Sequence, residues 1–306
     1  MRRLVLGTRG SDLARAQAAL VQCALAIDSE IEIIRTSGDE RSGRSPEPLD
    51  RHAGRKGMFT AEIQRALLGG RIDVAVHSAK DLPSEATDGL EICAALPRAA
   101  IEDVLISKQP GELREGATVA TGSVRRQHQL RFTRPDVKVV DLRGNVPTRL
   151  RKLIASDWDA IILARAGLER LGFDCAAGVI EFEGQQLPVE ILPIDNFLPA
   201  GGQGIVALEI RRDDEQTREV VEAISDRAAL FCLRAEREFL RLLNGDCGTP
   251  VGVIAALNHG TIEMQAQIFD EGRVQPRAAA LRKDAAAIRP EAIAAELFDL
   301  IHGSKN

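Results

Sequence analysis

The stretch TVATGSVRRQHQLRFTRPDVKVVDLRGNVPTRLRKLIASDWDAIILA, residues 118–164, decides the fold. Short apolar runs alternate in it with longer segments whose apolar residues recur at helical spacing. The pattern predicts strands at 118–121, 137–142 and 159–164 and helices at 125–133 and 147–155. Such alternation is typical of an α/β fold, in which parallel sheets are covered by helices on both faces.

The same alternation continues on both sides of this stretch. Strands are predicted at 4–7, 31–35, 72–77, 90–96 and 103–108, and helices at 11–26 and 60–68. The segment 96–103 and the Pro- and Gly-rich stretch 187–204 are candidate crossings between two sheets. A smaller α+β domain is predicted beyond about residue 215, from two helices within 217–243, strands at 251–257 and 261–269 and a helix near 289–302.

Composition and charge favour an ordinary globular protein. Of the 306 residues, 44% are hydrophobic, 28% are charged and 3% are aromatic, and the formal net charge is −5. So few aromatic side chains and an acidic balance argue against nucleic-acid binding. The five cysteines are odd in number and form no CxxC pair, so we expect neither a disulfide framework nor a metal site. We expect a cytoplasmic location, since the sequence has no secretory signal and no apolar stretch long enough to span a membrane.

Polar and basic residues follow the predicted strands at their carboxyl ends, where ligands bind in open α/β sheets. The polar segments after five of the strands begin at Thr8, His77, Thr121, Arg143 and Arg165. Residues 122–152 hold nine Lys or Arg and two Asp, which gives a local net charge of +7. Arginine forks and free backbone N–H groups at helix starts suit carboxylates or phosphates. The sequence therefore predicts a cleft that binds an anion.

Some of these residues also have a purely structural interpretation. A solvated helix surface explains three of the arginines, Arg131, Arg134 and Arg151. Ser11 and Ser123 are suitable N-caps, a role that is compatible with ligand binding. We interpret His77 as structural, and the short GGQG run at 201–204 does not fit a dinucleotide-binding fingerprint.

Asp81 and Cys247 differ in kind from the basic residues. A carboxylate inside a basic cleft weakens the binding of a pure anion, but it stabilises a positive charge that the ligand carries or develops. Cys247 lies among glycines in LNGDCGTPVG, residues 243–252. One interpretation is a buried structural thiol, and the other is a reactive thiol that carries a covalent group. The residues alone predict a polyanionic ligand with a cationic centre, held in a two-domain cleft.

Eight stretches of the chain resemble motifs of the porphobilinogen deaminase family and occur in the family's order. They are TRGSDLARAQ (8–17), RKGMFTAEI (55–63), VHSAKDLP (76–83), TGSVRRQHQL (121–130), LRGNVPTRL (142–150), ILARAGLERLG (162–172), LPAGGQGIVALEIR (198–211) and LNGDCGTPVG (243–252). The resemblance implies two periplasmic-binding-protein-like α/β domains around a cleft and a smaller α+β C-terminal domain. It implies domain 1 at 1–96 and 197–214, domain 2 at 97–196 and domain 3 at 215–306.

The resemblance also implies an activity, that of a hydroxymethylbilane synthase. Such a transferase condenses four porphobilinogen molecules with loss of ammonia on a covalent dipyrromethane cofactor, and water then releases hydroxymethylbilane. The cofactor is expected in thioether linkage to Cys247, and Asp81 is expected to be catalytic. Cofactor binding is implied for Lys80, Thr121, Ser123, Arg125 and Arg126. Substrate binding is implied for Arg9, Ser11, Gln17, Ser78, Arg143, Arg149 and Arg170.

The resemblance further implies a monomer, with loop 38–57 as a lid and Lys56 and Phe59 at the edge of this lid. The chain departs from the usual family pattern at several positions. Ile101-Glu102-Asp103 stands where the family commonly has Pro-Arg-Asp, which removes an arginine near the domain boundary. Other departures are Gly122 and Gly202 in place of Ser and Val, and Gly-Asp-Cys-Gly in place of Gly-Gly-Cys-Gln around the cysteine.

Two other functions remain open from the sequence. A non-catalytic cytoplasmic protein that binds an organic anion would explain the arginines, but it would not require Asp81 in the cleft or Cys247 on a Gly-rich loop. Nucleic-acid binding would explain only the positive charge of residues 122–152, and it should show a steep salt dependence.

Overall fold

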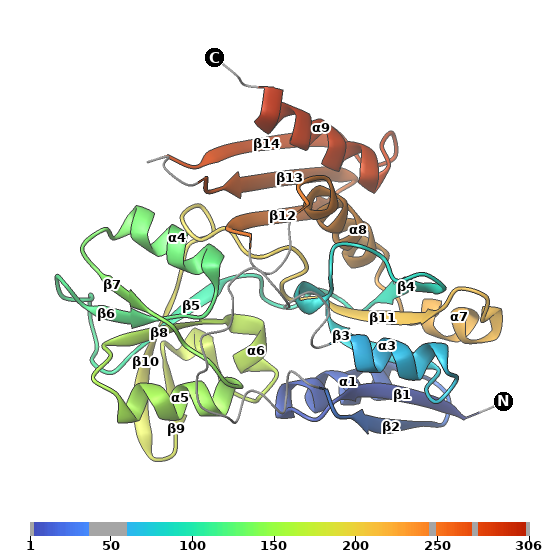
Figure 1. Cartoon of the computed structure of the whole chain (residues 1–306), viewed down its shortest axis with the longest axis horizontal. Coiled ribbons are helices and arrows are strands. Elements are labelled where there is room, and N and C mark those ends of the chain that lie inside the picture. The colour runs from blue at the N-terminus through green and yellow to red at the C-terminus, as the bar shows by residue number, and fades with distance from the viewer. Residues whose placement is uncertain (1–2, 37–59, 245–248, 271–274, 304–306) are drawn as a thin grey trace.

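The computed structural model describes residues 3–36, 60–244, 249–270 and 275–303. Within these residues the chain forms two larger sheets and a smaller C-terminal sheet, each with its own helices, which confirms the predicted mixed α/β class (Figure 1). The first sheet lies on the right of Figure 1, the second on the left and the C-terminal sheet above both. The predicted lid at 38–57, with Lys56 and Phe59, lies outside the described residues, as does Cys247.

The first sheet has five strands in the order β2-β1-β3-β11-β4. Alternation along the strands points Leu6 and Val76 toward α1 on one face, and Ala75 toward α3 on the other. Ser11 caps α1, and its Oγ accepts a 3.3 Å hydrogen bond from the backbone N–H of Ala14. The elements are β1 (Leu4–Arg9), α1 (Asp12–Ala24), β2 (Ser29–Ile34), α3 (Ala61–Leu68), β3 (Val74–Ser78), the 3-10 turn η1 (Ala79–Asp81), β4 (Leu90–Ala95), β11 (Val206–Arg211) and α7 (Glu215–Glu222).

The second sheet has six strands in the order β7-β6-β8-β5-β10-β9. Leu130 of α4 packs with Ile162 on one face, while Leu150 of α5 packs with Ile161 on the other. Neighbouring residues of one strand therefore enter different cores, as the pleat requires. The elements are β5 (Asp103–Ser107), β6 (Thr118–Ala120), α4 (Val124–Thr133), β7 (Lys138–Val140), α5 (Val146–Ala155), β8 (Ala160–Ala164), α6 (Arg165–Glu169), η2 (Cys175–Ala177), β9 (Val179–Phe182) and β10 (Gln185–Ile191).

The expectation of purely parallel sheets is wrong. β5 runs antiparallel to β8 and β10, and β11 runs antiparallel to β3 and β4. β5 and β11 are each the first strand after the chain crosses from one sheet to the other. Each therefore runs in the opposite direction to the two strands beside it. Both sheets are mixed for this reason.

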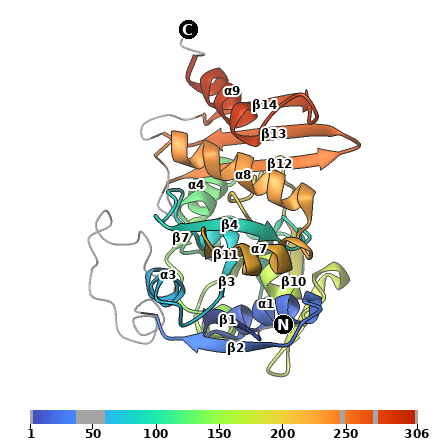
Figure 2. The same ribbon diagram turned by 90° about the vertical axis from the view of Figure 1, so that its right-hand side faces the viewer.

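The C-terminal sheet is antiparallel, in the order β12-β13-β14, and α8 and α9 cover one face of it. Phe239 of α8 and Leu297 of α9 are fully buried in this core. Figure 2 shows this sheet and α9 at the top and the β1–β2 edge of the first sheet at the bottom. The elements are α8 (Arg227–Leu242), β12 (Val251–Asn258), β13 (Thr261–Ile268), β14 (Arg277–Asp284) and α9 (Pro290–Gly303).

Glu236 of α8 connects the C-terminal unit to both crossings. Its carboxylate is fully buried and accepts hydrogen bonds from Arg98 Nη1 at 2.5 Å, from the Gly202 N–H at 2.6 Å and from the Ala255 N–H at 2.8 Å. Arg98 lies in the first crossing and Gly202 in the second, so one side chain holds the two crossings and β12 together. The domain boundaries at 96/97, 196/197 and 214/215 stay a prediction.

Glu102, at the position where an arginine is usual in the family, lies within 3.4 Å of Arg165 at the end of β8. Arg165 also pairs with Glu169 at 2.6 Å. Glu102, just before β5, therefore pairs with Arg165, which follows β8 in the same sheet.

Candidate active site

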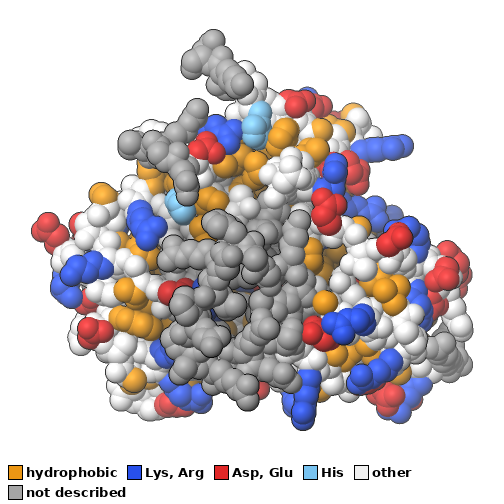
Figure 3. Space-filling view, viewed as in Figure 1, with side chains coloured by type: hydrophobic (Ala, Val, Ile, Leu, Met, Phe, Trp, Pro, Cys, Tyr) orange, Lys and Arg blue, Asp and Glu red, His pale blue; other side chains and the backbone are white. Residues whose placement is uncertain are grey.

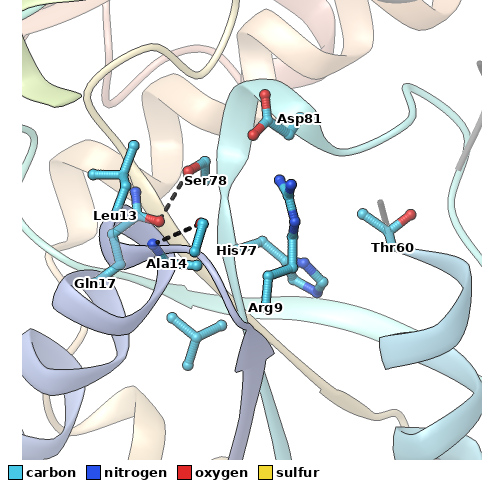
Figure 4. Close-up of a pocket in the computed structure, with 10 residues that line it drawn as sticks. Arg9, Leu13, Ala14, Gln17, Thr60, His77, Ser78 and Asp81 are labelled. Atoms are coloured by element: carbon cyan, nitrogen blue, oxygen red, sulfur yellow. Dashed lines mark hydrogen bonds between the residues drawn. The ribbon is translucent and has the colours of Figure 1, made fainter. Parts of the chain in front are cut away.

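A pocket opens where β1 and β3 of the first sheet end (Figure 4). In it the side chain of Arg9 extends toward Asp81, and the imidazole of His77 lies between Arg9 and Thr60. The parallel register of β1 and β3 brings the residues after both strands to the same edge of the sheet. Ten residues line the pocket: Arg9, Ser11, Leu13, Ala14, Gln17, Thr60, Val76, His77, Ser78 and Asp81.

Gln17 gives this pocket a buried amide. Its Oε1 accepts a 2.9 Å hydrogen bond from Ser78 Oγ, which fixes the orientation of the side chain. Its Nε2 is buried and has no hydrogen-bond partner among the described residues. A buried donor without a partner is costly, so this amide suits an acceptor that a ligand supplies. The structure thus brings together Gln17 and Ser78, two of the residues for which substrate binding is predicted.

Lys80 points from the first sheet toward the second. Its Nζ donates to Oε1 of Gln203 at 3.5 Å, and Nε2 of Gln203 donates to Asp103 Oδ1 at 2.9 Å. Burial lowers the pKa of Lys80 to about 8; the positive charges of Arg126 and Arg125 lower it further, while Asp81 and Asp103 oppose the shift. Lys80 is therefore within electrostatic reach of the second sheet.

Asp103 organises two of the predicted cofactor ligands. It is fully buried at the start of β5, with Arg125 Nη1 at 2.8 Å from one carboxylate oxygen and Arg126 Nη2 at 2.7 Å from the other. Burial alone would raise the pKa of Asp103, but the two guanidinium groups outweigh it and hold the pKa well below its usual range. One carboxylate facing two arginines leaves a net positive charge at the start of α4.

Arg125 and Arg126 differ in what else they contact. Arg125 Nη1 also donates to Gln129 Oε1 at 2.8 Å and to the Leu198 carbonyl at 2.9 Å, which ties α4 to the second crossing. Arg126 Nη1 donates to the Ile162 carbonyl at 3.0 Å. The Nε of each arginine is buried and has no hydrogen-bond partner among the described residues. Both arginines therefore keep donor capacity next to the site.

Thr121 and Ser123 make hydrogen bonds at the N-terminus of α4, next to these arginines. Ser123 is the N-cap, and its Oγ accepts from the Arg126 N–H at 3.5 Å. Thr121 is buried, and its Oγ1 accepts from the Ser123 N–H at 3.4 Å. The capping interpretation of Ser11 and Ser123 therefore agrees with the observed hydrogen bonds, and a ligand role of either residue stays a prediction.

The remaining arginines for which substrate binding is predicted on the second sheet follow β7 and β8. Arg149 Nε donates to the Gly144 carbonyl at 2.7 Å, and burial together with Arg126 and Arg143 lowers the pKa of Arg149 to about 10, while Asp81 opposes the shift. Arg143 is half-exposed and pairs with Asp141 at 2.7 Å. Arg170 Nη2 donates to the Gly204 carbonyl at 2.7 Å. Asp81 thus interacts electrostatically with Lys80 on its own sheet and with Arg149 on the other.

The site holds two buried arginines, whereas many other basic residues of the chain lie on the outer surface. In the space-filling view, exposed Lys and Arg side chains lie among Asp and Glu around the rim of the face (Figure 3). Arg125 and Arg126, by contrast, are each about 95% inaccessible to solvent, at 4% and 5% exposure. Charges in a buried site are screened far less by salt than exposed ones. The site is therefore suited to an anionic ligand, although the net charge of the chain is negative.

Three residues that matter to this geometry were not predicted from the sequence: Asp103, Gln203 and Glu236. Gln203 lies in the GGQG run, whose glycines gave no indication of a polar link between the two sheets. Among the described residues, no group of three or more His, Cys, Asp or Glu is arranged to hold a metal ion. Nor does the described part of the chain contain a helix with the length and apolar character needed to cross a membrane.

Family models and known proteins match this chain along almost its whole length. The family described as "Porphobilinogen deaminase, dipyromethane cofactor binding domain" matches residues 4–219, and "Porphobilinogen deaminase, C-terminal domain" matches residues 230–299. Porphobilinogen deaminase of Nitrobacter winogradskyi is 43% identical over 98% of this chain and 96% of its own length. That of Roseiflexus sp. is 42% identical over 87% of this chain and 85% of its own length. The periplasmic VFT2 domain of Bordetella pertussis BvgS overlaps only loosely, with a TM-score of 0.38 and 17% identity over 72% of this chain and 85% of that domain. This chain belongs to the porphobilinogen deaminase family.

Proposed function

We propose that this chain is a hydroxymethylbilane synthase, a transferase of tetrapyrrole biosynthesis that condenses four porphobilinogen molecules with loss of ammonia and releases hydroxymethylbilane. The observation that carries the proposal is the position of Asp81. Its carboxylate lies in a pocket with Arg9 and interacts electrostatically with Lys80 and Arg149. A carboxylate among these cations fits a polyanionic substrate that becomes cationic at one carbon when ammonia leaves.

The buried donors of the site fit the dipyrromethane cofactor of the family. Two linked pyrroles carry acetate and propionate groups, which require several cationic or N–H donors. Arg126 Nε and Gln17 Nε2 are buried donors without a partner among the described residues, and Lys80 adds a cation beside them. When bound, the cofactor supplies a primer pyrrole that reacts with incoming substrate. We propose that Cys247 attaches it, and that Lys80, Thr121, Ser123, Arg125 and Arg126 hold it.

Asp81 would stabilise a positive charge that develops in the substrate, besides orienting it. When the amino group of porphobilinogen leaves as ammonia, the remaining methylene and pyrrole ring carry a positive charge. A fixed carboxylate near the pyrrole N–H stabilises that charge more than it stabilises the neutral substrate, so it lowers the barrier. We assign this catalytic role to Asp81.

The basic residues would bind the acid side chains of substrate and product. Guanidinium groups bind carboxylates with two parallel hydrogen bonds, so they orient each pyrrole as well as attract it. Both sheets contribute, so a growing chain could be held from two sides. We propose substrate binding by Arg9, Ser11, Gln17, Ser78, Arg143, Arg149 and Arg170.

An anion-binding protein without catalysis is the alternative function, and the position of Asp81 argues against it. A carboxylate beside Arg9 reduces affinity for an anion and would bring no benefit without a cation to stabilise. We also propose that the protein is a cytoplasmic monomer, as the family resemblance implies. We propose that it does not bind nucleic acid, and the acidic net charge of −5 supports this last point. Elution volume in gel filtration would test the oligomeric state.

The function is tested by the intact mass of the purified protein under denaturing conditions, with peptide mapping around Cys247. We expect a covalent mass excess of two pyrrole units on the Cys247 peptide and none in the Cys247→Ser variant. Protein without the excess should gain it on incubation with porphobilinogen and then release hydroxymethylbilane and ammonia. A protein that neither carries nor acquires the excess, and releases no ammonia, would contradict the enzyme and favour the anion-binding alternative.

A further inference from the structure

Glu209 is a buried acid on β11 that has no part in the chemistry proposed above. It is 4% exposed, and its position in the middle of the first sheet makes an ionised side chain costly unless donors surround it. The structure supplies such donors from two other elements. His77 Nε2 on β3 lies 3.0 Å from Oε2, and Gln64 Nε2 on α3 lies 3.0 Å from Oε1 and 3.3 Å from Oε2.

The first contact follows from strand pairing. β11 runs antiparallel to β3, with Ala207 opposite His77 and Glu209 opposite Ala75. His77 and Glu209 are therefore diagonal neighbours on one face of the sheet, within reach of long side chains. Because His77 lines the pocket that contains Asp81, Glu209 supports the wall of this pocket from behind.

The second contact reaches a different wall. Gln64 lies on α3, one turn after Thr60, which precedes the helix and also lines the pocket. The N–H of Gln64 donates to the Thr60 carbonyl at 2.8 Å, so fixing Gln64 fixes Thr60 as well. Through one carboxylate, Glu209 thus connects the β3 wall of the pocket to its α3 wall.

Charge keeps this acceptor ionised. Burial would raise the pKa of Glu209, but the hydrogen bond and charge of His77, the Gln64 amide and the charge of Arg237 on α8 together hold it below its usual value. Arg237 is itself anchored by a 3.4 Å hydrogen bond to the Ser84 carbonyl. An ionised carboxylate accepts from both donors at once, whereas a neutral acid would lose part of this capacity.

We infer that Glu209 is a positioning residue, which holds His77 and the start of α3 so that the pocket keeps the shape that binds substrate. The inference rests on the proposed function, since the substrate meant is porphobilinogen. Asp81 is held independently, because the Ala79 N–H donates to the Ile205 carbonyl at 3.0 Å at the start of η1. Loss of the Glu209 contacts should therefore affect the binding of substrate more than the chemical step.

The test is Glu209→Gln, which keeps the size of the side chain and removes its charge. We expect KM for porphobilinogen to rise about tenfold while kcat changes less than about twofold, because ground-state binding is what is lost. We also expect faster amide hydrogen exchange in α3, with no change in α7. The exposed Glu219→Gln on α7 is the matched control and should change neither quantity.

Gln64→Met is the second variant, in case Glu209→Gln does not fold. It removes one donor, leaves the His77–Glu209 contact in place, and should produce the same changes in KM and in α3 exchange. The double variant should be less harmful than the sum of the single variants, since both act through one carboxylate. Unchanged KM and unchanged α3 exchange in the folded variants would overturn the inference, as would a fall in kcat that accounts for the whole loss.

The two proposals can fail separately. If the wild-type protein does not turn over porphobilinogen, the proposed function is wrong. Amide exchange alone then tests whether the contacts of Glu209 with His77 and Gln64, the Glu209 network, hold α3 in place. In that case, unchanged exchange of α3 in both variants would overturn the network too.

Discussion

Asp103 accepts a 2.7 Å hydrogen bond from Arg126, and both side chains are buried where β5 and α4 meet at the edge of the site. The same carboxylate lies 2.8 Å from Arg125 and accepts from Gln203. Asp103 therefore neutralises part of the positive charge of α4 and fixes the orientation of the guanidinium groups of Arg125 and Arg126. A cluster of arginines without this acid would repel one another in a buried region.

Replacing Asp103 by Asn should destabilise the protein strongly. The variant leaves two buried guanidinium groups without a counter-charge, and the expected loss is about 3–5 kcal/mol in the free energy of unfolding. Denaturant unfolding measures it, with the exposed Asp213→Asn as control, which should change the free energy of unfolding by less than about 0.5 kcal/mol. A comparably small effect of Asp103→Asn would mean that water or a ligand group takes the place of the carboxylate.

The sequence pattern predicts the fold well where a strand is buried on both faces. VAV in β3 and AIILA in β8 are continuous apolar runs that helices cover, and both strands lie where expected. β14 was missed because RAAALRKD alternates half-exposed and exposed residues and contains small side chains, so the apolar signal is weak. β9 and β10 were missed because polar residues interrupt the apolar ones in 179–191 and because Pro188, which is unusual inside a strand, falls within β10.

Much of the candidate site can also be predicted, because strand ends mark it. Lys80, Asp81 and Arg149 follow strand ends or open helices in the sequence, and the structure brings them within electrostatic reach of one another. The supporting residues cannot be found in this way. Gln203 and Asp103 are 100 positions apart and meet only because the chain crosses twice between the sheets. A single polar residue in a Gly-rich loop carries no local signal of such a partner.

Asp81→Ala should separate binding from chemistry. Because the role proposed for the carboxylate is to stabilise charge that develops only when ammonia leaves, we expect kcat to fall at least about 100- to 1000-fold while substrate still binds. Single-turnover release of ammonia and equilibrium binding of porphobilinogen measure the two effects. Asp88→Ala, an exposed acid nearby, is the control. Turnover close to that of the wild type would remove Asp81 from the mechanism.

Arg149→Leu should impair cofactor loading or chain growth. Arg149 lies close enough to Asp81 and Arg126 for their charges to affect its pKa, so it is placed to bind a carboxylate between the two sheets. Intact mass after incubation with porphobilinogen should show an unloaded protein or stalled additions. Arg143→Leu should have a similar but weaker effect, since Arg143 is half-exposed. The control is Arg131→Leu on the exposed face of α4; normal loading and growth in all three variants would show that the assignments are misplaced.

Lys80 should make substrate binding depend on pH. Its pKa of about 8 means that the ammonium loses its charge as pH rises through 8, so KM for the anionic substrate should increase above that pH. Lys80→Arg keeps the charge and should flatten the rise, whereas Lys138→Arg at an exposed position should not. Because the unfolded chain holds this proton up to its ordinary pKa of 10.5, Lys80 should also make folding more favourable as pH rises from about 8 to 10.5. A wild-type KM that is constant across pH 8 would contradict the role of Lys80.

Gly202 should be intolerant of any side chain. Its φ is +76°, and a Cβ there would lie 2.9 Å from both the carbonyl carbon of Ala79 and the backbone nitrogen of Lys80. Gly70 is a matched control, because its φ is +70° and a Cβ there would meet nothing within 4 Å. Gly70→Ala should cost about 1 kcal/mol of unfolding free energy, which is the strain of the backbone alone.

Gly202→Ala should cost more than this, because η1 must move away, and it should raise KM since η1 carries Lys80 and Asp81. Denaturant unfolding and steady-state kinetics on both variants give the comparison. Equal losses of stability and unchanged KM would mean that the second crossing can shift without disturbing the turn that carries Asp81. A larger loss for Gly202→Ala with a raised KM would instead show that the second crossing and the turn with Asp81 are packed as one unit, so that a residue without chemistry of its own sets the position of the Asp81 carboxylate.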